Sequence, residues 1–246
     1  MSSYRRGTAL TMLGALALTA CGADGRDLPE DEMNTSELAE LLLFEPDEYP
    51  FETASIEADD DHPARVAEQQ WPGLAGAASG AGMGLPGVPE ADCGMDELEE
   101  ILDLLVSGED HDPQAGVWAE LDSSEADDDS GPPLSLEGAA ILLQSHDEVD
   151  ESETEELWEQ FYDACAGTSE HEVGDLSLEP LEIEGAHGFS RQVELAEEDP
   201  DIPALDTHVV HLEFGQNSLR VLGFGIIEEE MEEVVTAQLD RLEEAG

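Results

Sequence analysis

The sequence predicts an α+β fold, a single domain in which helices pack on one antiparallel sheet and one disulfide stabilises the whole. Two observations lead to this prediction. Strand-like segments outnumber helical ones, and they follow one another through short turn sequences instead of alternating with helices as a parallel sheet requires. The expected order is helix, strand, linker, helix, two strands, helix, four strands, helix.

The first predicted helix covers residues 34–44. Asn34 can cap its start, and Glu37 stands three residues later, where a capping box has its glutamate. Pro46 ends the helix because a proline cannot continue it, and residues 49–57 follow as a strand. The apolar face of the helix consists of Leu38, Leu41 and Leu42.

The composition changes over residues 58–90, which contain six glycines and four prolines among acidic residues. Such a segment cannot bury a core of its own. We therefore expect a linker or long loop. Trp71 is the one residue within it that could dock on a folded domain.

A second helix is predicted to end at Gly108, with an apolar stripe formed by Leu98, Ile101, Leu102 and Leu105. Residues 116–121 and 134–143 follow as strands, separated by the acidic loop 122–133. The next helix begins at the capping box 152–155. Leu157, Phe161 and Cys165 fall one turn apart on it, so Cys165 should face the core.

The C-terminal half gives the clearest pattern, with strands predicted at residues 171–178, 188–195, 207–214 and 219–224. Residues 215–218 form the last turn. With a turn centred there, Phe214 is expected opposite Leu219 on one face, and Glu213 opposite Arg220 on the other. A final helix starts at Glu228, and its apolar stripe is Met231, Val235, Leu239 and Leu242.

Residues 1–20 have the pattern of a lipoprotein signal peptide. Arg5 and Arg6 form the basic start, and residues 8–18 form an apolar core too short to span a bilayer. Small residues then precede Cys21. We expect cleavage before Cys21 and acylation of its thiol and new amino group with palmitate-type chains, which hold the protein on the extracytoplasmic face of the cell membrane. An ordinary secretory signal with a chance cysteine is the alternative.

The rest of the chain divides into a tether, residues 21–33, and a folded domain, residues 34–246, which includes the linker or loop 58–90. No segment after the leader resembles a membrane span. The predicted membrane attachment therefore depends on the lipids alone.

The three cysteines have different predicted roles. With Cys21 acylated, Cys93 and Cys165 remain as an even pair in an oxidising compartment, where a disulfide is expected. Closing their loop of about 73 residues contributes roughly 4 kcal/mol in the chain-entropy model. A metal or reactive-thiol pair is the alternative, but neither cysteine has another cysteine or a histidine at ligand spacing.

The formal net charge is −56 at pH 7, from 63 acidic residues against seven arginines and no lysine. This composition excludes nucleic acids and anionic lipid headgroups as specific ligands, because both need a basic surface. The expected role of most of these carboxylates is a solvated acidic surface.

The acidic runs 57–61 and 125–129 each contain three adjacent aspartates, which could hold Ca²⁺ weakly. An EF-hand loop is excluded, because alignment on Gly131 puts Ala126 at the first ligand position and Pro132 directly after the turn. We expect solvated loops and no specific metal site.

No catalytic constellation is predicted. His208 and His211 lie three apart in a strand and so point to opposite faces. Residues 188–192 lack the second glycine of a nucleophile elbow, and carboxylate pairs are too abundant to be informative. No glycine-rich phosphate loop joins a strand to a helix. We therefore expect a protein without cofactor that is not an enzyme; His62, His111 and His146 are expected to be solvated.

The chain resembles actinobacterial sensor-domain lipoproteins, which are similar to the extracellular domain of a membrane serine/threonine protein kinase. The resemblance covers residues 36–244 and rests on loose spacings: a leucine-rich opening with an acidic-proline stretch at 38–50, Pro89 to Cys93, Trp158, Phe161 and Cys165 on one helix, the strand-turn-strand 209–225, and the final helix. It implies a one-domain antiparallel sheet that binds an unidentified envelope ligand without catalysis. Kinase-linked members resemble a two-disulfide design, whereas this chain offers only Cys93 and Cys165.

The leading interpretation is therefore a lipid-anchored, extracytoplasmic binding or sensor-like lipoprotein whose partner is a small ligand or an envelope protein. A structural or assembly lipoprotein is second, a weak divalent-cation binder third, and an enzyme last. A deep apolar cleft between sheet and helices would favour the first, and an exposed apolar surface patch the second.

Overall fold

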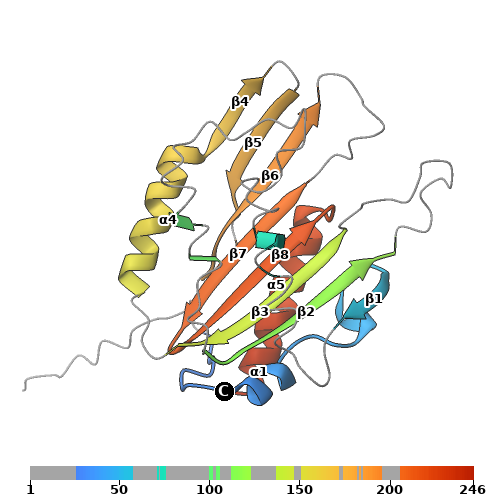
Figure 1. The fold of residues 1–246 in the computed structure, drawn as a ribbon, viewed down its shortest axis with the longest axis vertical. Helices are drawn as coiled ribbons and strands as arrows, with labels where there is room; N and C mark the ends of the chain where they lie inside the picture. The colour runs from blue at the N-terminus through green and yellow to red at the C-terminus, as the bar shows by residue number, and fades with distance from the viewer. Residues whose placement is uncertain are drawn as a thin grey trace, which may run out of the picture.

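The computed structural model describes residues 26–57, 71, 73–75, 100–101, 104–105, 112–122, 137–146, 151–171, 174–181, 183, 185–195 and 206–246. Eight strands form one antiparallel sheet with the order β1-β2-β3-β8-β7-β6-β5-β4 (Figure 1). Helices pack on this sheet, so the predicted α+β architecture is confirmed.

The strands are β1 (Thr53–Glu57), β2 (Gln114–Leu121), β3 (Gly138–Ser145), β4 (Gly167–His171), β5 (Gly174–Pro180), β6 (His187–Leu195), β7 (Thr207–Phe214) and β8 (Asn217–Phe224). The helices are α1 (Thr35–Glu40), the 3₁₀ turn η2 (Pro46–Glu48), α4 (Glu151–Cys165) and α5 (Glu228–Glu243). The sheet consists of two meanders, β1-β2-β3 and β4 to β8, joined by the pairing of β3 with β8. Every residue of these two strands is buried, because both faces of the sheet are covered at its centre.

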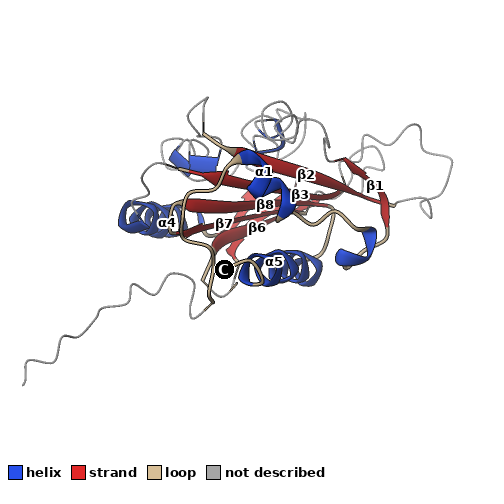
Figure 2. Ribbon diagram, turned by 90° about the horizontal axis from the view of Figure 1, so that it is seen from below, coloured by secondary structure: helices blue, strands red, loops and turns tan. Residues whose placement is uncertain are grey.

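One face of the sheet, which we call the α5 face, is covered by α5, α1 and the chain around residue 50 (Figure 2). The capping box predicted at the start of α1 is present: Asn34 Oδ1 accepts from the backbone of Ser36 and Glu37, and the Glu37 carboxylate accepts from Asn34. The buried side chains of this face come from α1, the residues directly after it, α5 and the sheet, and they include Leu38, Leu42, Val117, Ile141, Leu212, Val221, Met231, Val235, Leu239 and Leu242.

The other face, which we call the α4 face, packs against Trp158 and Phe161 of α4. Helical residues from the middle of the chain pack there too: Trp71, Leu74, Ala75, Ile101 and Leu105. The Trp71 indole donates to the Leu105 carbonyl at 2.8 Å. The predicted docking of Trp71 is confirmed, and so is the buried helical stripe at Ile101 and Leu105. The remainder of the predicted linker 58–90 lies outside the described residues.

Residues 26–33, which we call the N-terminal strap, pack on the domain although the sequence analysis assigned them to the tether. Leu28 is buried in the core of the α5 face. The Asn217 side chain donates to two strap carbonyls, those of Pro29 at 2.8 Å and Asp31 at 3.0 Å. This part of the predicted tether therefore belongs to the fold.

The predicted register of the last hairpin is wrong by two residues. Phe214 pairs with Asn217, not with Leu219, and Arg220 pairs with His211, not with Glu213. The turn contains only two residues, because Gly215 has a φ of +59° and so allows a tight reversal. A shift of two residues leaves every side chain on its predicted face.

The strand predicted at residues 171–178 is in fact a hairpin. It combines the end of β4 with most of β5, so the sheet has one strand more than expected. β4 is a polar edge strand in which Thr168 is exposed, so it lacks the alternation by which strands are recognised. Smaller differences occur in the first half, where α1 ends at Glu40 and β1 begins only at Thr53.

We predict that Gly215→Ala destabilises the domain by about 1–3 kcal/mol, because an alanine is strained at this positive φ. A Cβ there would also lie 2.4 Å from backbone atoms of Glu30 in the strap. Urea unfolding at neutral pH measures the change. Gly73→Ala, whose Cβ meets no atom within 4 Å, is the control. Equal stability of the two variants would contradict the described turn.

Candidate functional site

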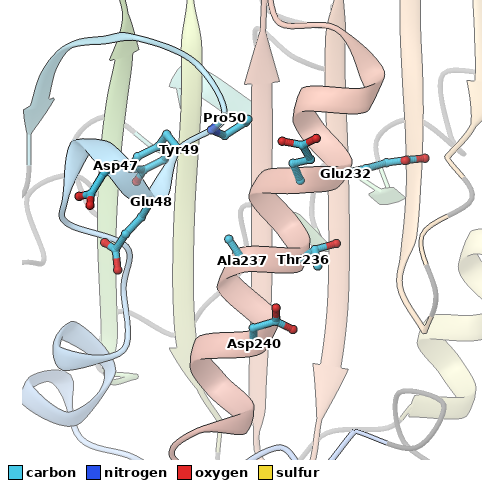
Figure 3. A pocket seen from close by; sticks show the side chains of 9 residues that line it. Asp47, Glu48, Tyr49, Pro50, Glu232, Thr236, Ala237 and Asp240 are labelled. Carbon is cyan, nitrogen blue, oxygen red and sulfur yellow. The ribbon is translucent and has the colours of Figure 1, made fainter.

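An open groove of about 470 Å³ lies between α5 and the segment that contains η2 (Figure 3). Five of its lining residues are carboxylates, and Tyr49 adds a partly apolar ring. The lining residues are Asp47, Glu48, Tyr49, Pro50, Glu232, Glu233, Thr236, Ala237 and Asp240. We call it the acidic groove. The sequence positions these groups because the exposed side of the amphipathic α5 is rich in glutamate.

Two arginines pair with carboxylates of the groove: Arg241 makes an ion pair with Glu48, and Arg26 makes one with Asp240 at 2.6 Å. The Tyr49 hydroxyl donates to the Leu43 carbonyl at 3.0 Å, and burial together with the adjacent Glu48 raises the pKa of Tyr49. The electrostatics of the groove favour a cationic group over an anion. Within the described residues, however, no three His, Cys, Asp or Glu side chains are placed to hold a metal ion.

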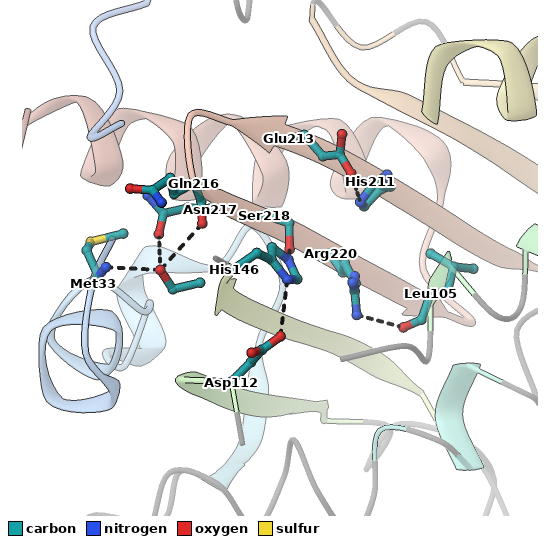
Figure 4. Close-up of polar contacts among 11 residues, drawn as sticks. Met33, Leu105, Asp112, His146, His211, Glu213, Gln216, Asn217, Ser218 and Arg220 are labelled. Atoms are coloured by element: carbon teal, nitrogen blue, oxygen red, sulfur yellow. Dashed lines mark hydrogen bonds and ion pairs between the residues drawn. The ribbon is translucent and has the colours of Figure 1, made fainter. Parts of the chain in front are cut away.

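A second concentration of polar groups is buried on the α4 face (Figure 4). We call it the polar cluster, and its members are Asp112, Gln144, His146, Thr154, Trp158, His187, His211, Glu213, Ser218 and Arg220. The two-residue period of β7 and β8 brings alternate side chains of both strands to this face. The helix α4 covers them with Thr154 and Trp158.

Arg220 is the buried charge of the cluster, with 2% of the residue exposed. One guanidinium nitrogen donates to the Leu105 carbonyl at 3.1 Å. Burial lowers the pKa of Arg220 to about 10, while the nearby Glu213 carboxylate acts in the opposite direction. At neutral pH the guanidinium therefore stays charged. One of only seven arginines in this acidic chain is thus buried inside the domain.

His211 is held between the sheet and α4. Its Nδ1 accepts from the indole N–H of Trp158 at 3.4 Å, and its Nε2 lies 3.9 Å from Glu213 Oε1. Burial lowers the pKa of His211 well below 6.5, and repulsion from Arg220, His187 and His146 acts in the same direction. The imidazole is therefore neutral at physiological pH.

The indole of Trp158 organises this part of the cluster. It stacks on His187 with centroids 5.8 Å apart and planes 9° apart, and on His211 at 6.3 Å. Burial lowers the pKa of His187 against the opposing effect of acidic residues on α4. The Thr154 hydroxyl donates to Glu213 Oε1 at 3.0 Å. Neutral rings and one hydroxyl thus connect α4 to β7.

Asp112, His146 and Ser218 form a chain of the kind used to activate a serine nucleophile. His146 Nε2 lies 2.9 Å from Ser218 Oγ, and Nδ1 lies 3.5 Å from Asp112 Oδ2. Ser218 is only 1% exposed, and it lies in a regular strand instead of a strained strand-to-helix turn. The hydroxyl is therefore not placed to attack a substrate in this conformation. The chain joins the ends of β2, β3 and β8.

Gln144 lies opposite Ser218 in the sheet and is 1% exposed. Neither atom of its amide has a hydrogen-bond partner among the described residues. A buried amide without partners costs about 1–3 kcal/mol of stability. Gln144 thus gives the cluster unused capacity to donate and to accept a hydrogen bond.

Some of the predicted site residues lie within the described part of the chain and others do not. Cys165 is the last residue of α4, half-buried against the α4 face as predicted, whereas Cys21 and Cys93 lie outside the described residues. The disulfide therefore stays a prediction. His208 and His211 do point to opposite faces: His208 Nε2 contacts the Ile226 carbonyl at 2.8 Å, whereas His211 contacts α4.

The expectation that His146 is solvated is wrong, because its side chain is 17% exposed and bonded to Ser218. The polar cluster as a whole was missed. The alternation of β7 and β8 did put Glu213 and Arg220 on one face, but the alternation by itself does not indicate that a helix covers this face. The long amphipathic α4 was the signal that could have shown that this face is covered.

No protein-family model, characterised protein or solved structure matches this chain. The resemblance to sensor-domain lipoproteins accordingly stays a prediction, and the site is interpreted from its own geometry.

We predict that the buried histidines make stability depend on pH. Because their folded-state pKa values lie below 6.5, the unfolded chain binds more protons, and stability falls as the pH drops from 7.5 through 6.5. Each histidine contributes a slope of at most about 1.4 kcal/mol per pH unit. Urea unfolding at pH 7.5, 6.5 and 5.5 in constant high salt measures the slope.

His211→Gln should flatten that dependence, because its amide can still accept from Trp158 but does not titrate. His208→Gln is the control, since it removes a buried histidine of the same strand that lies outside the polar cluster. An unchanged slope in His211→Gln would show that the cluster does not govern the response to acid.

Proposed function

We propose that this chain is a lipid-anchored binding or sensor-like lipoprotein of the extracytoplasmic membrane face. The single observation that carries the proposal is the leader ending at Leu18-Thr19-Ala20-Cys21, the pattern at which bacterial lipoproteins are acylated and cut. The folded domain follows almost at once, because the N-terminal strap is packed on it from Arg26 onward.

Among the described residues there is no helix with both the length and the apolar character needed to cross a bilayer. In the part of the chain that the structure describes, Ile227 is the one large apolar side chain that is exposed. The described surface therefore has no large apolar patch for assembly, and the acidic groove, which is not the deep apolar cleft expected of a binding domain, suits a ligand held by polar and charged contacts.

The anchor is tested by expression in a bacterium with lipoprotein processing and labelling with radioactive palmitate. The protein should incorporate label, lose the mass of residues 1–20 and partition into the detergent phase of a Triton X-114 extract. Cys21→Ser should lose the label, whereas Cys165→Ser, a matched thiol substitution, should keep it. An unlabelled protein in the aqueous phase would contradict the anchor.

We also propose the disulfide between Cys93 and Cys165, supported by the half-buried position of Cys165 at the end of α4. Mass spectrometry of the non-reduced protein after thiol alkylation should find both residues unalkylated and linked. Cys93→Ser and Cys165→Ser should each lower stability by about 4 kcal/mol, and the double variant by no more than either single one. Additive losses would argue against a bond between them.

A further inference from the structure

We propose that the domain stands end-on to the membrane, so that the end formed by the N-terminal strap, the β7–β8 turn and the C-terminus is the end nearest to the bilayer. The hairpin β4–β5 then points away from the bilayer. This inference rests on the acylation of Cys21 proposed above, and it adds the orientation of the domain.

The first step is that the strap is fixed to one end of the sheet. Besides the two bonds from Asn217, the backbone N–H of Gln216 donates to the Glu30 carbonyl at 2.9 Å. Arg26, the first described residue, makes ion pairs with Asp240 at 2.6 Å and Glu243 at 3.5 Å on the last turns of α5. The beginning of the described chain is thus held at the end where the C-terminus lies (Figure 1).

The second step is the reach of the remaining chain. Cys21 precedes Arg26 by five residues, which span at most about 18 Å when fully extended. The lipid on Cys21 must enter the bilayer, so this end of the domain stays within about 18 Å of the membrane surface.

The third step is the length of the sheet. Phe214 lies next to the turn, three residues from His211, and His211 pairs with His187 of β6. From His187, β6 continues away from the turn for eight more residues to Leu195. At about 3.3 Å per residue the far end of β6 is roughly 36 Å from the turn. Leu195 pairs with Gly174, so the tip of the β4–β5 hairpin lies at that far end.

The fourth step is charge. A bacterial membrane with anionic headgroups repels this strongly acidic chain, and the repulsion acts on any part of the domain that comes within about 8 Å, one Debye length, of the headgroups. The tether holds one end only. The tether keeps the strap end close to the bilayer, while the headgroups repel the acidic side chains on the rest of the domain. The body therefore points away from the membrane. The end itself carries exposed acids that prevent close adsorption: Asp27, Glu30, Asp31, Glu32, Glu243 and Glu244.

The test measures energy transfer from a dye on the acylated, full-length protein to acceptor-labelled lipid in phosphatidylglycerol–phosphatidylcholine vesicles. An azide-bearing amino acid attaches the dye either at exposed Glu244, beside the C-terminus, or at exposed Asp175, near the far hairpin. Transfer should be at least twofold greater from position 244. Equal transfer, or greater transfer from position 175, would overturn the end-on orientation.

Two variants separate the steps of the argument. A ten-residue Gly-Ser insertion before Arg26 adds up to about 35 Å of reach and should reduce transfer from position 244. Asn217→Ala removes two strap bonds and should act in the same direction if the domain stays folded. No change with the insertion would also overturn the proposal. Protein that does not float with the vesicles would instead show that the anchor itself is absent, which is a different failure.

Discussion

The pairing of β3 with β8 is the contact on which the rest of the structure depends. It joins two meanders that would otherwise be separate small sheets, and it buries both strands from both sides. A strand buried on both faces needs a cover on each. The helices α5 and α1 supply one and α4 with Trp71 the other, so the early and middle parts of the chain can complete the domain only around this central pair.

The polar cluster follows from the same constraint. Arg220 and His211 face each other at the centre of the sheet, where α4 removes them from water. Their burial is tolerated because the indole of Trp158, the Leu105 carbonyl and Glu213 replace water as partners. The contacts of Thr154 and Trp158 hold α4 in this placement, and they make the placement sensitive to protonation of His211.

The sequence predicted those elements whose signals are local. The cap at Asn34, the burial of Leu38 on α1 and the faces of β7 and β8 all depend on residues a few positions apart, and they were predicted correctly. The register of β7 with β8 was not, because Gly215 closes the turn in two residues, and Asn217 pairs with Phe214 while its side chain bonds a strap almost two hundred residues earlier. The burial of His146 likewise depends on Ser218 in a distant strand. Long-range contacts of this kind leave no period in the sequence.

The two outermost strands of the sheet have a consequence for the attachment to a membrane surface proposed above. β4 is five residues long and polar, and the pairing of β1 with β2 shifts register between Thr53 and Ser55. Short, polar or irregular edges are poor templates for another strand. Lipid-anchored copies, as proposed, would collide sideways more often than molecules in solution, and edges of this kind would disfavour the pairing of neighbouring sheets into fibrils.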